Sequence, residues 1–261
     1  MASRSAKPLL VIVGPTASGK TALAIRLAQQ FNGEIISADS RTIYRGMDIG
    51  TAKPSLEEQD GVPHHLIDVV DPDEPFTVAD FQQLAYAAID DIHARGKLPI
   101  LVGGSGLYVD SVIYGYDFAG SSGERDAVNP RHLAAGVPRQ QLRLREDTLV
   151  LGMQVDPEVL RGRIALRIKA MLDQGLLEEV RELSDRYDWA LPPMQAPAYK
   201  AVREYLDGAK SLEQASDDFA VYDAQLARKQ RTWFKRNNSI HWLVDPSEAD
   251  DLVATFLNNR S

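Results

Sequence analysis

The hydrophobic positions of this 261-residue chain alternate between short apolar runs and longer stretches with helical spacing. Mostly apolar runs at 9–13, 34–37 and 98–102 are typical of parallel strands that are covered on both faces. Between them, 21–31 and 77–95 carry apolar residues at the spacing of an amphipathic helix. Strand, helix, strand, helix and strand in this order predict an α/β fold built on a parallel sheet.

Turn and capping residues mark the ends of these elements. Asn32-Gly33 follows the first helix and suits left-handed backbone geometry. Thr77 is expected to cap the second helix, with Asp80 three residues later as its acidic partner, and Gly96 ends that helix. A further short strand is predicted at 66–70.

The pattern changes after Tyr116. The stretch 119–145 is rich in glycine and proline and poor in large apolar residues, so we interpret 117–147 as a small insertion. Strand-like residues return at 148–155, and Asp156-Pro157 is a typical helix start. The remaining elements are predicted as helices at about 157–173, 175–187, 198–207 and 212–236, a strand at 240–244 and a helix at 248–258. We therefore predict one core made of 9–116 and 148–258, with a helical C-terminal part.

The amino-acid composition limits the cellular location of the protein and the chemistry that it can carry out. No apolar run approaches the roughly 18 residues that a membrane-spanning helix needs, and residues 1–7 lack the apolar core of a signal peptide. With no cysteine in the chain, disulfides, thiolate catalysis and Cys-ligated zinc are excluded. We expect a cytoplasmic protein without membrane association. The net charge of −8 argues against broad, non-specific nucleic-acid binding, but lysines and arginines cluster at 228–236, where a solvated helix face is the simpler alternative.

The strongest chemical signal is GPTASGKT at 14–21, which matches the phosphate-binding P-loop G-x-x-x-x-G-K-[ST] in full. It lies between a predicted buried strand and a predicted helix, as its mechanism requires. Backbone N–H groups and the helix dipole favour an anion there, Lys20 adds a positive charge, and the Thr21 hydroxyl can ligate Mg²⁺. The residues predicted to bind a diphosphate are Gly14, Pro15, Thr16, Ala17, Ser18, Gly19, Lys20 and Thr21.

Two polar residues follow the neighbouring strands. Asp39 comes after the second predicted strand and Ser105 after the third, so both are expected at the carboxyl edge of the sheet beside the loop. A helix cap for Asp39 and a turn position for Ser105 are the alternative interpretations.

Several longer blocks together resemble the tRNA dimethylallyltransferases, also called tRNA isopentenyltransferases. The resemblance covers most of 9–116 and about 148–245, and the DSxxIYxGMDIGTAKP block is far more specific than the phosphate loop. The matching blocks are GPTASGKTALAIRLA at 14–28, IISADSRTIYRGMDIGTAKP at 35–54, PHHLIDVVDP at 63–72, ADF at 79–81, PILVGGSGLY at 99–108, DQGLLEEV at 173–180 and ARKQRTWFKR at 227–236.

This resemblance implies a P-loop NTPase-like core and transfer of a dimethylallyl group from dimethylallyl diphosphate to the exocyclic amine of an adenosine beside the tRNA anticodon. It implies that Asp39 is the general base, that Ser105 contacts the target base, and that the loop binds the diphosphate with Mg²⁺. It also places Arg163 near the donor. The residues expected to contact the tRNA anticodon stem-loop are Asp39, Ser40, Arg41, Thr42, Ser105, Arg125, Arg228, Lys229 and Arg231.

The chain departs from the family pattern mainly in the insertion, which is shorter than usual, with PRQQLRLRED at 138–147 in place of an Arg-rich stretch. The shortened insertion leaves transfer of the same group to free AMP open. A P-loop kinase or nucleotide-regulated binding module is a third possibility, from another class of function. A kinase predicts a Walker-B aspartate after a hydrophobic strand, and LPILVGG has none. We expect the enzyme to be a monomer.

Overall fold

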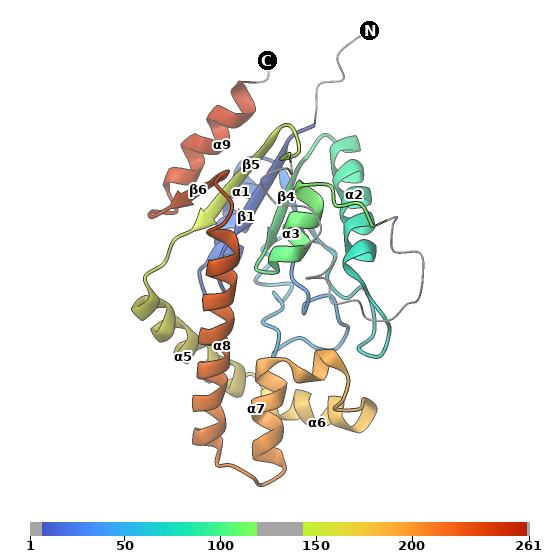
Figure 1. Cartoon of the computed structure of the whole chain (residues 1–261), viewed down its shortest axis with the longest axis vertical. Helices are drawn as coiled ribbons and strands as arrows, with labels where there is room; N and C mark the ends of the chain where they lie inside the picture. Colours follow the sequence, from blue (N-terminus) through green and yellow to red (C-terminus); the bar gives the residue numbers. More distant parts are fainter. Residues whose placement is uncertain (1–6, 119–142, 260–261) are drawn as a thin grey trace.

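A six-stranded parallel sheet forms the centre of the computed structural model, which describes residues 7–118 and 143–259 (Figure 1). The strands follow the spatial order β3-β2-β4-β1-β5-β6, and every neighbouring pair is parallel. The P-loop strand therefore lies in the middle of the sheet. The strands are β1 (Leu9–Val13), β2 (Gly33–Ser37), β3 (His64–His65), β4 (Leu98–Gly103), β5 (Thr148–Met153) and β6 (Ile240–Leu243).

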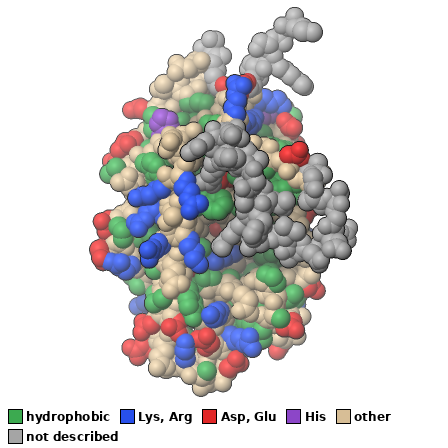
Figure 2. Space-filling model, viewed as in Figure 1, with side chains coloured by type: hydrophobic (Ala, Val, Ile, Leu, Met, Phe, Trp, Pro, Cys, Tyr) green, Lys and Arg blue, Asp and Glu red, His purple; other side chains and the backbone are tan. Residues whose placement is uncertain are grey.

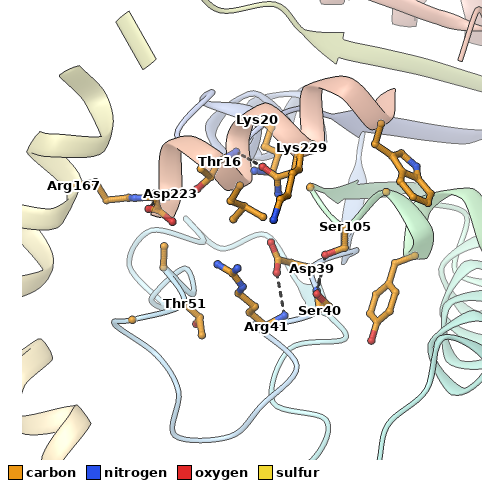
Figure 3. Close-up of a pocket in the computed structure, with 18 of the residues that line it drawn as sticks. Thr16, Lys20, Asp39, Ser40, Arg41, Thr51, Ser105, Arg167, Asp223 and Lys229 are labelled. Atoms are coloured by element: carbon orange, nitrogen blue, oxygen red, sulfur yellow. Dashed lines mark hydrogen bonds and ion pairs between the residues drawn. The ribbon is translucent and has the colours of Figure 1, made fainter. Parts of the chain in front are cut away.

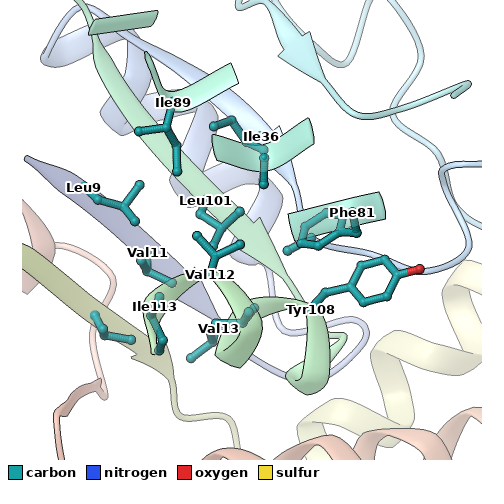
Figure 4. Close-up of a cluster of buried hydrophobic side chains, with 14 of the residues drawn as sticks. Leu9, Val11, Val13, Ile36, Phe81, Ile89, Leu101, Tyr108, Val112 and Ile113 are labelled. Atoms are coloured by element: carbon teal, nitrogen blue, oxygen red, sulfur yellow. The ribbon is translucent and has the colours of Figure 1, made fainter. Parts of the chain in front are cut away.

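Helices cover both faces of this sheet. One face packs on α2 (Val78–Ala94) and α3 (Gly106–Ile113), and the other on α1 (Lys20–Gln30) and α9 (Glu248–Asn258). Alternate residues of β1 serve the two layers, because successive side chains of a strand point to opposite faces. Leu9, Val11 and Val13 contact the α2–α3 layer, which Figure 4 shows around Phe81 and Val112.

The C-terminal half adds a helical end below the carboxyl edge of the sheet (Figure 1). It consists of α5 (Pro157–Asp173), α6 (Leu176–Arg186), a 3₁₀ turn (Pro192–Gln195), α7 (Pro197–Leu206) and α8 (Leu212–Phe234). These helices share a third apolar cluster, which also contains Met47 from the segment after β2. The helical end is thus packed directly against the loops that leave the sheet. Within the described residues, no helix is both long and apolar enough to cross a membrane.

Most of the predicted elements are confirmed, including the Thr77–Asp80 capping box of α2. The predicted strand at 66–70 is wrong: Leu66 and Asp68 adopt positive φ angles of 62° and 55°, which interrupt an extended chain. The sheet edge is instead the two-residue β3. Helix α3 was not predicted. Most of the predicted insertion, 119–142, lies outside the described residues, so the division into core and insertion stays a prediction.

A buried carboxylate, Glu34 on β2, holds together the amino end of the sheet, opposite its carboxyl edge. Glu34 on β2 is only 1% exposed and forms ion pairs with Arg95 and with Lys97, the latter at 2.8 Å, and a 2.7 Å hydrogen bond with His65 on β3. Burial by itself raises the pKa of Glu34, but the hydrogen bonds from Arg95, Lys97 and His65 outweigh it and lower the pKa to about 2. The Glu34 cluster thereby joins β2 and β3 to the turn between α2 and β4.

Glu34→Gln should lower the free energy of unfolding by about 2–3 kcal/mol at neutral pH, because it leaves three basic groups without their shared anion. Since the folded pKa lies below the unfolded one, the stabilisation is complete above pH 4.5 and lost as the pH falls toward 2. Urea unfolding at pH 7 and pH 3 measures both effects, with the exposed Glu57→Gln as control. Equal stability of Glu34→Gln and wild type at pH 7 would contradict this account.

Candidate functional site

A cavity of about 420 Å³ opens at the carboxyl edge of the sheet. The loops that follow β1, β2 and β4 form part of its wall, and α5 and α8 close it from the helical end (Figure 3). Residues from five segments of the chain thus meet at one place. The polar residues in its wall are Thr16, Lys20, Asp39, Ser40, Arg41, Thr51, Ser105, Arg167, Asp223, Lys229 and Gln230, and the apolar ones include Leu107, Tyr108, Met171, Phe219, Leu226 and Trp233.

The P-loop forms the anion-binding part of this wall. It turns through left-handed conformations at Ala17 (φ 58°) and Gly19 (φ 87°) before α1 begins at Lys20. No side chain caps the first turn of α1, so its N–H groups are available to an anion. One amide of the loop is already used: Gln230 on α8 accepts a 2.8 Å hydrogen bond from the Thr16 N–H. The hydrogen bond with Gln230 therefore ties the P-loop to α8, while the N–H groups at the start of α1 remain available to a ligand.

The cavity brings Lys20 of the P-loop close to two charged side chains from other segments, Asp39 and Arg167. Burial lowers the pKa of Lys20; the Asp39 carboxylate opposes this shift, and the Arg167 guanidinium reinforces it. Arg167 donates a 2.7 Å hydrogen bond to Thr16 Oγ1 and forms an ion pair with Asp223. An incoming diphosphate would relieve the electrostatic penalty on Lys20, because it brings negative charge to a site with buried positive charge.

Asp39 lies two residues after the end of β2 and is half-buried in the cavity wall. Its Oδ1 accepts a 3.0 Å hydrogen bond from the Arg41 N–H. The next helix is α2, which begins only at Val78, so the alternative interpretation of Asp39 as a helix cap is wrong. The carboxylate is held by a local turn and faces the phosphate loop (Figure 3).

Ser105 occupies the position before α3 but makes no side-chain capping bond. Instead, its hydroxyl accepts a 2.9 Å hydrogen bond from the Ser40 N–H and donates to Ser40 Oγ at 3.1 Å. Ser105 therefore joins the loops after β2 and β4 through Ser40, the residue next to Asp39, in the wall of the cavity.

The other predicted site residues are divided between the cavity and its surroundings. Ser40, Arg41 and Lys229 line it. Thr42 does not: it is 6% exposed, and its hydroxyl lies 3.0 Å from Ser37 Oγ, so its side chain supports the loop from inside. Thr21 is exposed on the first turn of α1.

Of the predicted arginines, Arg163 lies on the opposite side of the P-loop. It donates to the Ser18 carbonyl at 3.3 Å and lines a second cavity of about 500 Å³. Arg228 is exposed and Arg231 half-buried on α8. Arg125 lies outside the described residues.

Apart from Lys229, the sequence-based prediction of the site did not include the α8 residues that line the cavity. Asp223, Leu226, Gln230 and Trp233 recur every three or four residues along α8, which places them on one face. This spacing is present in the sequence, but the prediction for this helix was based on the basic residues at 228–236. Trp233 donates to Asp110 at 2.9 Å and packs so closely on Gly106 that a Cβ there would lie 2.2 Å from the indole.

Gln230→Ala should weaken binding of inorganic diphosphate about tenfold. It removes the acceptor of the Thr16 N–H and so loosens the loop, a loss of about 1 kcal/mol or slightly more. Isothermal titration calorimetry measures the affinity, with Gln225→Ala on the exposed side of α8 as the matched control. Unchanged affinity in Gln230→Ala would show that this contact does not hold the loop in its binding conformation.

Comparison with known proteins gives a consistent result. The model of the IPP transferase family matches residues 42–143 and 128–237. The tRNA dimethylallyltransferase of Oceanobacillus iheyensis is 38% identical, with 96% of each chain covered, and that of a Roseiflexus species is 40% identical, with 94% of this chain and 95% of the relative covered. The alignment with the first extends over 301 positions, more than the 261 residues of this chain, so that relative has residues without a counterpart here.

Solved structures agree. The tRNA isopentenylpyrophosphate transferase of Bacillus halodurans superposes with a TM-score of 0.84 at 37% identity, covering 97% of this chain and 98% of that one. A eukaryotic dimethylallyltransferase acting on tRNA superposes with a TM-score of 0.83 at 25% identity, covering 98% of this chain and 80% of that one. The similarity thus extends across the sheet and the helical end together.

Proposed function

Because the chain belongs to the IPP transferase family, we propose that it transfers a dimethylallyl group from dimethylallyl diphosphate to the exocyclic amine of the adenosine next to the anticodon of tRNA. The single observation that carries the chemistry is the shared cavity. It places a phosphate loop with an open helix end beside the Asp39 carboxylate, which no helix uses as a cap.

In this reaction the C1–O bond of the allylic diphosphate breaks and a bond forms between C1 and the adenine amine nitrogen. The diphosphate leaves with the electron pair of the C1–O bond, and the amine loses one proton. The P-loop amides and Lys20 stabilise the charge that develops on the leaving group. Asp39 accepts a hydrogen bond from the amine and takes its proton as the new bond forms, while Ser105 positions the base.

Arg167 and Asp223 support this arrangement from the helical end. The Arg167 guanidinium is held by Asp223 and by Thr16, so it adds positive charge beside the loop in a fixed place. Arg163, on the other side of the loop, contacts the backbone of Ser18 and supports diphosphate binding through the loop conformation.

We infer that a Mg²⁺ ion would bind with the diphosphate at the start of α1. Within the described residues there is no cluster of three or more His, Cys, Asp or Glu side chains that could cage a metal, which suits an ion bound by substrate phosphates, water and one hydroxyl. The Thr21 hydroxyl, exposed at the first turn of α1, would supply that ligand. When bound, Mg²⁺ would neutralise charge on the leaving diphosphate.

The outer face of α8 is suited to the RNA backbone. Figure 2 shows Lys and Arg side chains gathered on the face of the molecule that carries this helix. Arg228 is exposed on α8, Lys229 is exposed there and also lines the cavity, and Lys235 and Arg236 are exposed just after the last residue of the helix. Such a local basic surface attracts phosphates despite the negative net charge. The target base must leave its stack to reach Asp39, as enzymes that modify a base require.

The proposal also covers the oligomeric state, the cellular location and the length of the insertion. We infer that the enzyme acts as a monomer in the cytoplasm, where its tRNA substrate is found. The longer alignment with its relative supports a shortened insertion. No observation favours AMP as acceptor or a kinase reaction.

Incubation with radiolabelled dimethylallyl diphosphate and Mg²⁺ tests the function. An anticodon stem-loop, AMP and ATP with candidate acceptors are offered in parallel, and labelled products are separated by chromatography. Label on the stem-loop adenosine supports the proposal. Label on AMP alone, or phosphate transfer from ATP, would replace it with one of the two alternatives.

A further inference from the structure

Three successive backbone N–H groups in the segment after β2 converge on one carboxylate. The amides of Asp48 and Ile49 donate to Glu179 Oε2 at 2.9 and 2.7 Å, and the amide of Gly50 donates to Oε1 at 2.9 Å. Consecutive amides that point to one spot form an anion-binding concavity. Here the anion is a side chain of the protein itself, which comes from α6 in the helical end.

A tyrosine completes the arrangement. The Tyr199 hydroxyl, from α7, donates to Glu179 Oε1 at 2.9 Å. Burial and the Glu179 charge raise the pKa of Tyr199 above its usual range, so the hydroxyl keeps its proton and remains a donor. The ring is 0% exposed and packs on Gly50, where an added Cβ would lie 2.7 Å from it. Glu179 and Tyr199 therefore hold the same loop by hydrogen bonds and by packing.

The segment that they hold is a wall of the cavity. Gly50, Thr51 and Ala52 line it, and Figure 3 shows Thr51 on the opposite side from Thr16 and Lys20. The first part of the segment is fixed separately, because the Ala38 N–H donates to Val102 on β4 at 2.7 Å. A change at Glu179 would thus move the wall at 50–52 while Asp39 and the phosphate loop keep their places.

We propose that Glu179 and Tyr199 are positioning residues for prenyl transfer, which set the width of the cavity between the donor on the phosphate loop and the opposite wall. This inference rests on the proposed function. Neither side chain lines the cavity, so they act through residues 50–52. Reactive alignment is sensitive to such placement, since a shift of about 1 Å can cost 10²-fold in rate.

The test separates kcat from donor affinity. Glu179→Gln replaces an acceptor oxygen by an amide NH₂ that opposes the loop N–H groups, and kcat for an anticodon stem-loop should fall about 10²-fold. Tyr199→Phe keeps the ring on Gly50 and removes one donor to a charged acceptor, so kcat should fall about tenfold. The affinity for dimethylallyl diphosphate should stay within about twofold in both, because the phosphate loop is untouched. Glu178→Gln, one residue away and paired with Arg181 on the surface, is the matched control.

A double variant shows whether the two residues act together. Glu179→Gln with Tyr199→Phe should be no slower than Glu179→Gln alone, because both remove the same anchor. Wild-type kcat in Glu179→Gln, or parallel losses of kcat and donor affinity, would overturn the proposal; so would a loss explained entirely by the unfolded fraction in a thermal melt. Should Glu179→Gln not fold, Tyr199→Phe decides. A wild-type enzyme that labels no stem-loop refutes the proposed function instead.

Discussion

Asp39→Asn should reduce dimethylallyl transfer to the stem-loop by about 10²–10⁴-fold, the range expected for loss of a general base. The amide has the same shape, and its oxygen can still accept the hydrogen bond from the Arg41 N–H, so the turn after β2 is retained. What it loses is the ability to take the proton of the adenine amine. Single-turnover transfer of labelled donor, measured with both substrates saturating, gives the rate.

Donor binding separates this role from a structural one. Asp39 opposes the effect of burial on the pKa of Lys20 through its negative charge, and that same charge repels a diphosphate. Asp39→Asn should therefore bind dimethylallyl diphosphate as well as wild type or slightly better. Asp73→Asn, an exposed substitution outside the cavity wall, controls for the amide. Loss of donor binding together with normal turnover of bound substrate would refute the assignment.

Lys20→Met should abolish tight donor binding and lower kcat by about 10²–10³-fold, the loss expected when one group that stabilises the leaving charge is removed. Methionine fills a similar volume without charge. Calorimetry with the diphosphate donor and steady-state transfer measure the two effects, with the exposed Lys169→Met on α5 as control.

The stability of this variant distinguishes function from folding. Burial lowers the pKa of Lys20, which means that the folded protein holds this charge at a disadvantage. Lys20→Met should thus melt at the wild-type temperature or above it. A lower melting temperature with unchanged donor affinity would show that the lysine supports the fold instead of the ligand.

The core of the site could be predicted from the sequence because its signals are local. GPTASGKT lies between an apolar run and a helical pattern, and these fix both its conformation and its place at the sheet edge. Asp39 and Ser105 follow predicted strands, so parallel topology alone brings them to the same edge. Their hydrogen bonds through Arg41 and Ser40 refine this placement without changing it.

The rest of the site depends on contacts between distant segments. Gln230 reaches Thr16 across 214 residues of sequence, and Glu179 reaches Asp48 across 131. No local pattern encodes such pairs. Two other predictions failed for local reasons: the Thr42 hydroxyl lies against Ser37 instead of lining the cavity, and positive φ angles at Leu66 and Asp68 interrupt the predicted strand at 66–70. The resemblance to a family identified the matching sequence blocks, but it does not say which side chains form contacts with one another.

The most direct test of the account is a crystal structure with an unreactive thio analogue of dimethylallyl diphosphate and an anticodon stem-loop bound together. The diphosphate should lie on the amides at the start of α1 and against Lys20, and the adenine amine should lie within hydrogen-bonding distance of the Asp39 carboxylate in the same cavity. A diphosphate bound elsewhere, or an adenine that stays stacked in the RNA away from Asp39, would contradict it.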